Sequence, residues 1–127
     1  MKESTFLYQA FYQAEDRFLF HTEENGFEHE VVFGYIQASL NLASWYGEGS
    51  EFANPLLEEL FLRRVYYNLL QAINDATNCR VLRQICLDQI HGPLIALKRH
   101  YCHSSAGYER FLTLQQDLRD IQYINDL

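Results

Sequence analysis

The sequence predicts an all-α protein, a compact bundle of four to six helices in a single domain of 127 residues. Three observations lead to this prediction. Apolar residues recur at spacings of three and four along most of the chain, as on the buried face of a helix. Hydrophobic residues make up 48% of the chain, which suits a domain with a core of its own. Short stretches rich in glycine, serine and asparagine separate the periodic segments and indicate loops.

The stretch from Asn54 to Ala76 has the clearest helix signals and is expected to be the central helix. Asn54 can cap it, and Pro55 follows at the first helical position, where its missing N–H costs nothing. One wide apolar face contains Phe61, Leu62, Val65, Tyr66, Leu69, Ala72 and Ile73. A second apolar row lies almost opposite and contains Leu56, Leu60 and Tyr67. We expect a helix that is apolar on two sides to lie between neighbours.

The first helix is expected from about Ser4 to His21, with Ser4 or Thr5 as its cap. Its apolar face would contain Phe6, Leu7, Ala10, Phe11, Ala14 and Phe18. An α+β alternative stays open here, in which residues 18–20 and 29–33 form a β-hairpin around Asn25-Gly26, a dipeptide typical of tight hairpin turns. Apolar and polar residues alternate imperfectly on both arms, which favours helix–loop–helix.

The second helix is expected from about Glu28 to Tyr46. Its buried side would contain Val32, Tyr35, Ile36, Leu40, Ala43 and Tyr46. Gly47 is expected to end this helix in the left-handed conformation, and the residues from Gly47 to Ser50 form a flexible loop.

Three further helical stretches follow the central helix. Thr77 or Asn78 can cap the first of them, whose apolar stripe contains Cys79, Leu82, Ile85, Cys86 and Ile90. Gly92-Pro93 would either break the chain or kink a longer helix, so that residues 94–102 form a short helix or a bent continuation. Ser104 or Ser105 can cap the last helix. Its narrow apolar seam contains Phe111, Leu114, Leu118 and Ile121, which suits packing against one neighbour.

The chain has no continuous apolar run approaching the ~18 residues of a membrane span, and its first residues do not resemble a signal peptide. A cytoplasmic location is therefore expected. The three cysteines, Cys79, Cys86 and Cys102, are expected to be reduced and buried, and thus slow to react with a thiol reagent.

No sequence motif for catalysis or for a cofactor stands out, so we predict neither an enzyme nor a cofactor or metal site. His100 and His103 would lie on one side of a helix, but nothing else is spaced to complete a zinc site. His21 and the cluster Glu28-His29-Glu30 could form the acid–base pair of a small helical enzyme, which is one alternative function.

Two arginines raise the question of nucleic acid. Arg80 and Arg83 on a short helix could belong to a DNA-reading element, but two cations are few for an acidic protein that must approach phosphates. A solvated face pairing with Asp75 and Asp88 is the simpler interpretation. We therefore expect no direct binding of nucleic acid and none of membrane.

Charge is the most informative bulk property. The net charge is −7. Residues 1–59 carry eleven Asp and Glu against two Lys and Arg, a balance of −9, whereas residues 60–127 carry six against eight, a balance of +2. Such asymmetry bears on partners and solubility rather than on the fold.

The acidic first half suggests a surface for a basic partner. The candidate partner-binding residues are Glu15, Asp16, Glu23, Glu24, Glu28 and Glu30, with Trp45 and Tyr46 as aromatic anchors. We expect a small cytosolic binding protein that masks a basic site on another protein. Its most concrete form would be a bacterial immunity protein or antitoxin that neutralises a nucleic-acid-cleaving toxin.

Two other interpretations stay open at this point. The acidity could serve solubility alone. The chain could also be a transcription or secretion adaptor that acts as a homodimer through the seam of its last helix, although we expect a monomer rather than a homodimer.

Overall fold

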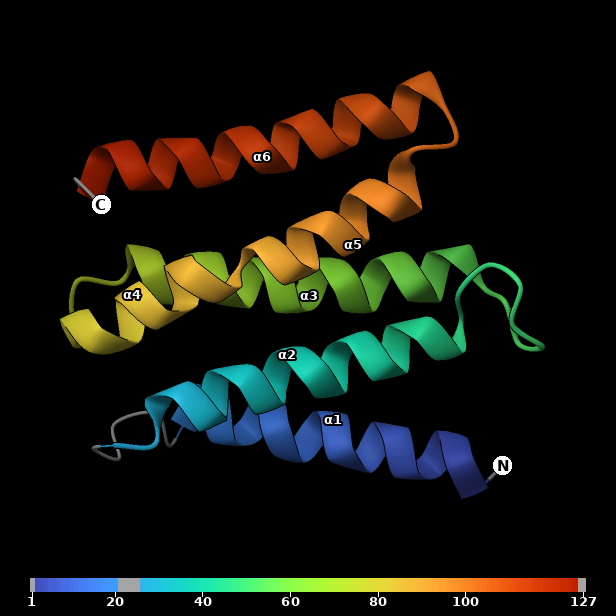
Figure 1. The fold of residues 1–127 in the computed structure, drawn as a ribbon, viewed down its shortest axis with the longest axis horizontal. Coiled ribbons are helices and arrows are strands. Elements are labelled where there is room, and N and C mark those ends of the chain that lie inside the picture. Colours follow the sequence, from blue (N-terminus) through green and yellow to red (C-terminus); the bar gives the residue numbers. More distant parts are fainter. Residues whose placement is uncertain (1, 21–25, 126–127) are drawn as a thin grey trace.

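A computed structural model describes residues 2–20 and 26–125, and over these ranges the chain forms six helices (Figure 1). They are α1 (Lys2–Phe20), α2 (Glu28–Trp45), α3 (Pro55–Asn74), α4 (Arg80–Gln89), α5 (His91–Tyr101) and α6 (Ser105–Asn125). The prediction of an all-α bundle of four to six helices is confirmed. The hairpin alternative is wrong, because residues 18–20 belong to α1 and residues 29–33 belong to α2. The turn proposed for this hairpin was Asn25-Gly26. Gly26 has a φ of 93°, and Asn25 lies outside the described residues.

The helix α3 lies at the centre of the bundle. It packs against α2, α4, α5 and α6, and α2 in turn packs against α1 (Figure 1). The helices α1 and α6 therefore lie at opposite edges of the molecule, with α3 between them. This arrangement places most of residues 1–59 on one side and α4, α5 and α6 on the other.

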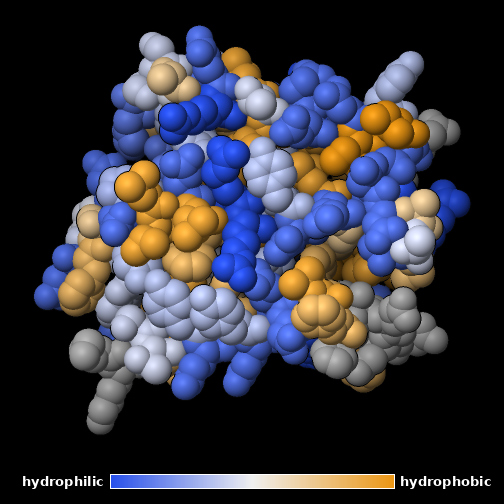
Figure 2. Space-filling view, turned by 180° about the vertical axis from the view of Figure 1, so that it is seen from behind, coloured by the Kyte–Doolittle hydropathy of each residue, from blue (hydrophilic) through white to orange (hydrophobic). Residues whose placement is uncertain are grey.

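The predicted apolar face of the central helix is confirmed, and its second apolar row is not. All seven residues of the predicted face are buried, with Val65, Tyr66 and Leu69 fully so. Leu56 and Leu60 are instead 78% and 51% exposed, because no described helix covers that side of α3. Seen from behind in Figure 2, an apolar patch at the left lies over the first half of this helix.

The start of α3 follows the sequence signals, whereas the start of α4 does not. The Asn54 side chain accepts a hydrogen bond from the Leu57 N–H at 3.2 Å, and Pro55 is the first helical residue. Cys79 caps α4 in place of Thr77 or Asn78, and its Sγ accepts from the Leu82 N–H at 3.4 Å. Thr77 is engaged earlier in the turn, where its N–H and hydroxyl both donate to the Asp75 carboxylate.

The Gly92-Pro93 pair lies inside a bent continuation. The Ile90 N–H donates to the Cys86 carbonyl at 2.9 Å and the Leu94 N–H donates to the Ile90 carbonyl at 3.1 Å, so α4 passes into α5 without a loop. Ile90 itself keeps helical dihedrals. Pro93 has no N–H to continue the ladder, which is the physical reason for the bend here.

The loop between α2 and α3 is held by hydrogen bonds. The Asn54 N–H donates to the Tyr46 carbonyl at 2.9 Å, and the Ser50 hydroxyl donates to the Trp45 carbonyl at 2.7 Å. The left-handed residue is Gly49, with a φ of 86°, and not Gly47 as predicted. A Cβ at Gly47 would lie 2.9 Å from a Glu58 carboxylate oxygen and 3.2 Å from the Ser44 carbonyl oxygen, so a side chain there would require the Glu58 side chain and the backbone to shift slightly.

The apolar seam of α6 packs inside the molecule. Phe111, Leu114 and Leu118 are buried, and the Tyr66 hydroxyl of α3 donates to the Leu114 carbonyl at 2.6 Å. The seam is therefore covered by its own chain. A homodimer built on this seam would first have to remove α6 from the core.

We predict that Leu69→Ala lowers the free energy of unfolding by about 2–5 kcal/mol, because it leaves a cavity at a fully buried position. The matched control is Leu60→Ala on the same helix, which should change it by less than about 0.5 kcal/mol since Leu60 is exposed. Chemical denaturation of both variants measures the difference. Equal losses in the two variants would contradict the described orientation of α3.

Candidate partner-binding surface

Glu15, expected on the acidic surface, is instead buried against α3. Its carboxylate accepts two hydrogen bonds from the Arg64 guanidinium, at 2.7 Å from Nε and 2.5 Å from Nη2. The Tyr35 hydroxyl of α2 also donates to it at 2.8 Å, and Asn68 Nδ2 donates to that hydroxyl at 2.7 Å. Glu15 is only 6% exposed, so it is withdrawn from any partner. The prediction that Glu15 belongs to the acidic surface is wrong, because its partner Arg64 is far away in sequence and the pairing leaves no local signal.

Glu28 is also withdrawn from the surface. It is the first residue of α2 and is 9% exposed. One of its carboxylate oxygens accepts a hydrogen bond from the Gly26 N–H at 3.0 Å. Its charge also lies at the positive end of the helix dipole, where it favours the start of α2. Glu28 therefore has a structural role in place of the predicted contact with a partner.

Two of the predicted carboxylates do lie on the surface. Asp16 of α1 and Glu30 of α2 are both exposed. Glu23 and Glu24 lie outside the described residues.

The two predicted aromatic anchors differ in their surroundings. The Tyr46 ring stacks on Phe61, and its hydroxyl forms a hydrogen bond with the Tyr8 hydroxyl at 2.6 Å. Burial and this hydrogen bond raise the pKa of Tyr8 to about 12. Trp45 stacks on Phe52, whose ring centroid lies 5.0 Å away and which is 49% exposed. Trp45 is thus the better placed of the two for contact with a partner.

The predicted acidic and aromatic residues do not meet at one place. Glu28 and Glu30 lie in the first turn of α2, and Trp45 is its last residue. At 1.5 Å per residue, the two ends of this helix are about 25 Å apart. The predicted surface is therefore two separate regions.

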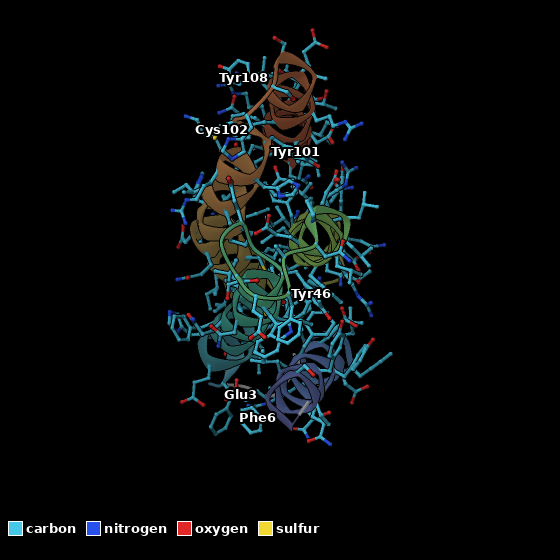
Figure 3. All side chains as sticks on the ribbon, turned by 90° about the vertical axis from the view of Figure 1, so that its right-hand side faces the viewer. Glu3, Phe6, Tyr46, Tyr101, Cys102 and Tyr108 are labelled. Carbon is cyan, nitrogen blue, oxygen red and sulfur yellow. The ribbon has the colours of Figure 1, made fainter. Side chains whose placement is uncertain are left out.

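A hollow beside Trp45 brings this residue together with carboxylates that the sequence analysis missed. We call it the Trp45 hollow. It has a volume of about 440 Å³ and is lined by Glu3, Leu7, Asn41, Ser44, Trp45, Ser50, Glu51 and Phe52. These residues come from the start of α1, the end of α2 and the loop before α3 (Figure 3 labels Glu3 and Phe6 at this end). Glu3 is far from Trp45 in sequence, so only the packing of α1 on α2 joins them.

Two further exposed side chains, one aromatic and one acidic, belong to elements that line the Trp45 hollow. Phe6 was predicted to be buried but is 69% exposed, on the first turns of α1. Glu48 is exposed on the loop, where its carboxylate lies 3.2 Å from His103 Nε2.

A second polar cluster joins the start of α3 to the end of α5. Glu58 contacts Nδ1 of His100, and the Tyr101 hydroxyl donates to Glu59. Arg63 donates to the Tyr101 hydroxyl at 3.2 Å, and this hydrogen bond raises the pKa of Arg63. Burial and the hydrogen bond to Glu59 raise the pKa of Tyr101. Tyr101 marks the end of α5 in Figure 3.

Within the described chain, two histidines lie close to a carboxylate: His100 beside Glu58 in this cluster, and His103 beside Glu48. Of the acid–base pair expected from His21 and the cluster Glu28-His29-Glu30, His21 lies outside the described ranges, and His29 stacks on Phe33. The hydrogen bonds of the cluster around Glu58 and Tyr101 hold α3 to α5.

Arg83 has a structural role. Its Nε donates to the Ile73 carbonyl and its Nη2 to the Asn125 side chain, both at 2.8 Å. These bonds tie the start of α4 to the ends of α3 and α6. The two hydrogen bonds from Thr77, and then the charge of Arg83, lower the pKa of Asp75. Within the described ranges, no three His, Cys, Asp or Glu side chains come together as a set of metal ligands.

Comparison with known proteins gives no further guidance, since no protein-family model, curated protein or solved structure matches the chain. Among the helices described, none combines the length and the apolar character needed to cross a membrane.

The prediction that all three cysteines are buried is wrong for two of them. Cys86 is buried, and burial raises the pKa of its thiol to about 12. Cys79 and Cys102 are exposed, because each lies at a helix terminus.

We predict that a chromogenic disulfide reagent modifies Cys79 and Cys102 rapidly in the native protein, and Cys86 only after unfolding, because the reactive form is an accessible thiolate. Mass spectrometry of the labelled peptides identifies each site. A variant with Ser at both exposed positions should show no fast phase. Rapid labelling of Cys86 would contradict its burial.

We also predict that Glu15→Gln lowers the free energy of unfolding by about 1.5–3 kcal/mol, the usual contribution of hydrogen bonds to a charged group. The Arg64 side chain is 39% exposed, so solvent screens part of the ion pair and a larger loss is not expected. The neighbouring Asp16→Asn is the control, and it should change stability by less than about 0.5 kcal/mol. Similar effects of both substitutions would show that Glu15 is not paired in solution.

Proposed function

We propose that this protein is a non-enzymatic binding protein whose acidic side, formed by α1, α2 and the loop before α3, covers a basic site on a partner protein. Three features of the molecule support the proposal. The first 59 residues carry a charge of −9 and the remainder carries +2. In space, the first part forms one side of the bundle (Figure 1). The surface of this side includes an aromatic pair, Trp45 and Phe52, flanked by carboxylates.

The observation that carries the proposal is the set of carboxylates that stays available once the fold has formed. Glu15 and Glu28 are buried, but five others on this side are exposed: Glu3, Asp16, Glu30, Glu48 and Glu51. Exposed carboxylates steer a basic partner during diffusional encounter, and aromatic side chains supply binding energy once contact is made.

The concrete form that we propose is an immunity protein or antitoxin that neutralises a nucleic-acid-cleaving toxin. Enzymes of that kind are basic where they bind phosphates. An acidic protein that covers such a cleft inhibits by occupying it and needs no catalytic residue of its own. The proposal includes a cytoplasmic location and a monomeric state, since the apolar seam of α6 is already used in the core.

We predict that the partner, captured at low salt with the tagged chain from its source cell, is a basic protein whose association slows steeply as salt rises. The variant Asp16→Lys/Glu30→Lys should slow association by about tenfold and flatten its salt dependence, because both carboxylates are exposed on the acidic side. The control, Asp88→Lys/Asp120→Lys, changes the net charge equally on the other side, where both residues are exposed.

Stopped-flow kinetics with the purified partner measures both variants, and thermal melts establish that each is folded. An unchanged rate in the first variant, or equal slowing in both, would contradict an interface on the acidic side.

A further inference from the structure

We propose that the Trp45 hollow binds an arginine side chain of the partner. This inference rests on the proposed function and adds the chemistry of one contact within it. Two features of the hollow favour arginine as the bound side chain: its aromatic pair and its carboxylates.

The aromatic pair provides a flat platform. The rings of Trp45 and Phe52 are nearly parallel, with an interplanar angle of 12° and centroids 5.0 Å apart. Phe52 is 49% exposed and Trp45 is half-buried, so the pair borders solvent. The platform is held in place, because the Ser50 hydroxyl donates to the Trp45 carbonyl at 2.7 Å. A planar guanidinium stacks on such rings and is attracted to their faces.

The charges around the platform favour a cation. Glu3 and Glu51 line the hollow from two different elements, α1 and the loop, and no lysine or arginine is among the lining side chains that the structure describes. Its remaining polar side chains, Asn41, Ser44 and Ser50, are small and uncharged. The volume of about 440 Å³ accommodates a long side chain, and it lies within the range of ligand sites in proteins. A guanidinium there would find carboxylate acceptors as well as ring faces.

The protein itself shows how this combination holds an arginine. The Arg64 guanidinium lies 5.2 Å from the ring centroid of Phe11 and 5.7 Å from that of Tyr12, and it donates two hydrogen bonds to the Glu15 carboxylate. Aromatic faces and a carboxylate together thus fix one guanidinium inside the fold. The Trp45 hollow presents the same kinds of group at the surface, and its described lining contains no basic residue. Arginine suits it better than lysine, because an ammonium group neither stacks nor donates as a planar fork.

The test uses the fluorescence of Trp45, which is the only tryptophan in the chain. The probe is the peptide Gly-Arg-Gly, blocked at both ends, and its control carries citrulline, which has nearly the same shape but no charge. We expect the arginine peptide to change the emission saturably in the millimolar range, and the citrulline peptide to leave it unchanged. A lysine peptide should bind several-fold more weakly. Equal responses to arginine and citrulline, equal affinities for arginine and lysine, or no response would overturn the inference.

Two variants locate the binding within the hollow while retaining Trp45. The variant Glu3→Gln/Glu51→Gln should lower the affinity for the arginine peptide by about tenfold. The control Asp16→Asn/Glu30→Gln has the same change of net charge and should lower this affinity by less than about twofold. Equal weakening would show that the peptide senses only overall charge and would overturn the inference.

The outcomes also separate this inference from the proposed function. If the peptide fails to bind while partner association keeps its salt dependence and its sensitivity to Asp16 and Glu30, only the assignment of the Trp45 hollow is refuted. If the peptide binds but the partner is indifferent to salt and to those residues, the proposed function is refuted instead.

Discussion

The contact between Glu15 and Arg64 is the interaction on which the position of α1 depends. The helix packs along α2, but it reaches α3 through side chains, chiefly this ion pair and the rings around it. Tyr35 and Asn68 complete the hydrogen bonding, so one buried network joins three helices. A paired charge inside a protein adds little net stability compared with apolar packing, but its geometry is demanding. The network therefore specifies where α1 lies more than it strengthens the fold.

That position of α1 also determines the candidate surface. With Glu15 held against α3, the N-terminal turns of α1 lie beside the end of α2, which brings Glu3 next to Trp45. The same network removes the Glu15 carboxylate from the surface and pairs it with Arg64, whose side chain stays 39% exposed. The number of Asp and Glu residues in the first half therefore does not show how their charge is distributed in space. Exposed carboxylates lie at both ends of the α1–α2 pair, and the buried Glu15 carboxylate lies between them.

Local signals in the sequence predicted the helices well, because capping and periodicity act over a few residues. Asn54 and Pro55 mark the start of α3, and its apolar face follows directly from helical spacing. The sequence could not show which face of a helix is left without a neighbour, as for Leu56 and Leu60, because that depends on where α1 and α6 lie. It could not show that Glu15 is buried or that Glu3 faces Trp45, since both depend on contacts between segments far apart in the chain. Cys79 was missed as a cap because serine, threonine, asparagine and aspartate are the usual caps.

The account places the interface on the acidic side, with the Trp45 hollow within it, and hydrogen–deuterium exchange of the chain with and without its partner tests this placement most directly. Amides that become protected on binding report which backbone segments the partner covers or stabilises. We predict that protection rises in the first turns of α1, the last turns of α2 and the loop of residues 46–54. Protection confined to α4, α5 and α6, with these segments unchanged, would contradict the account.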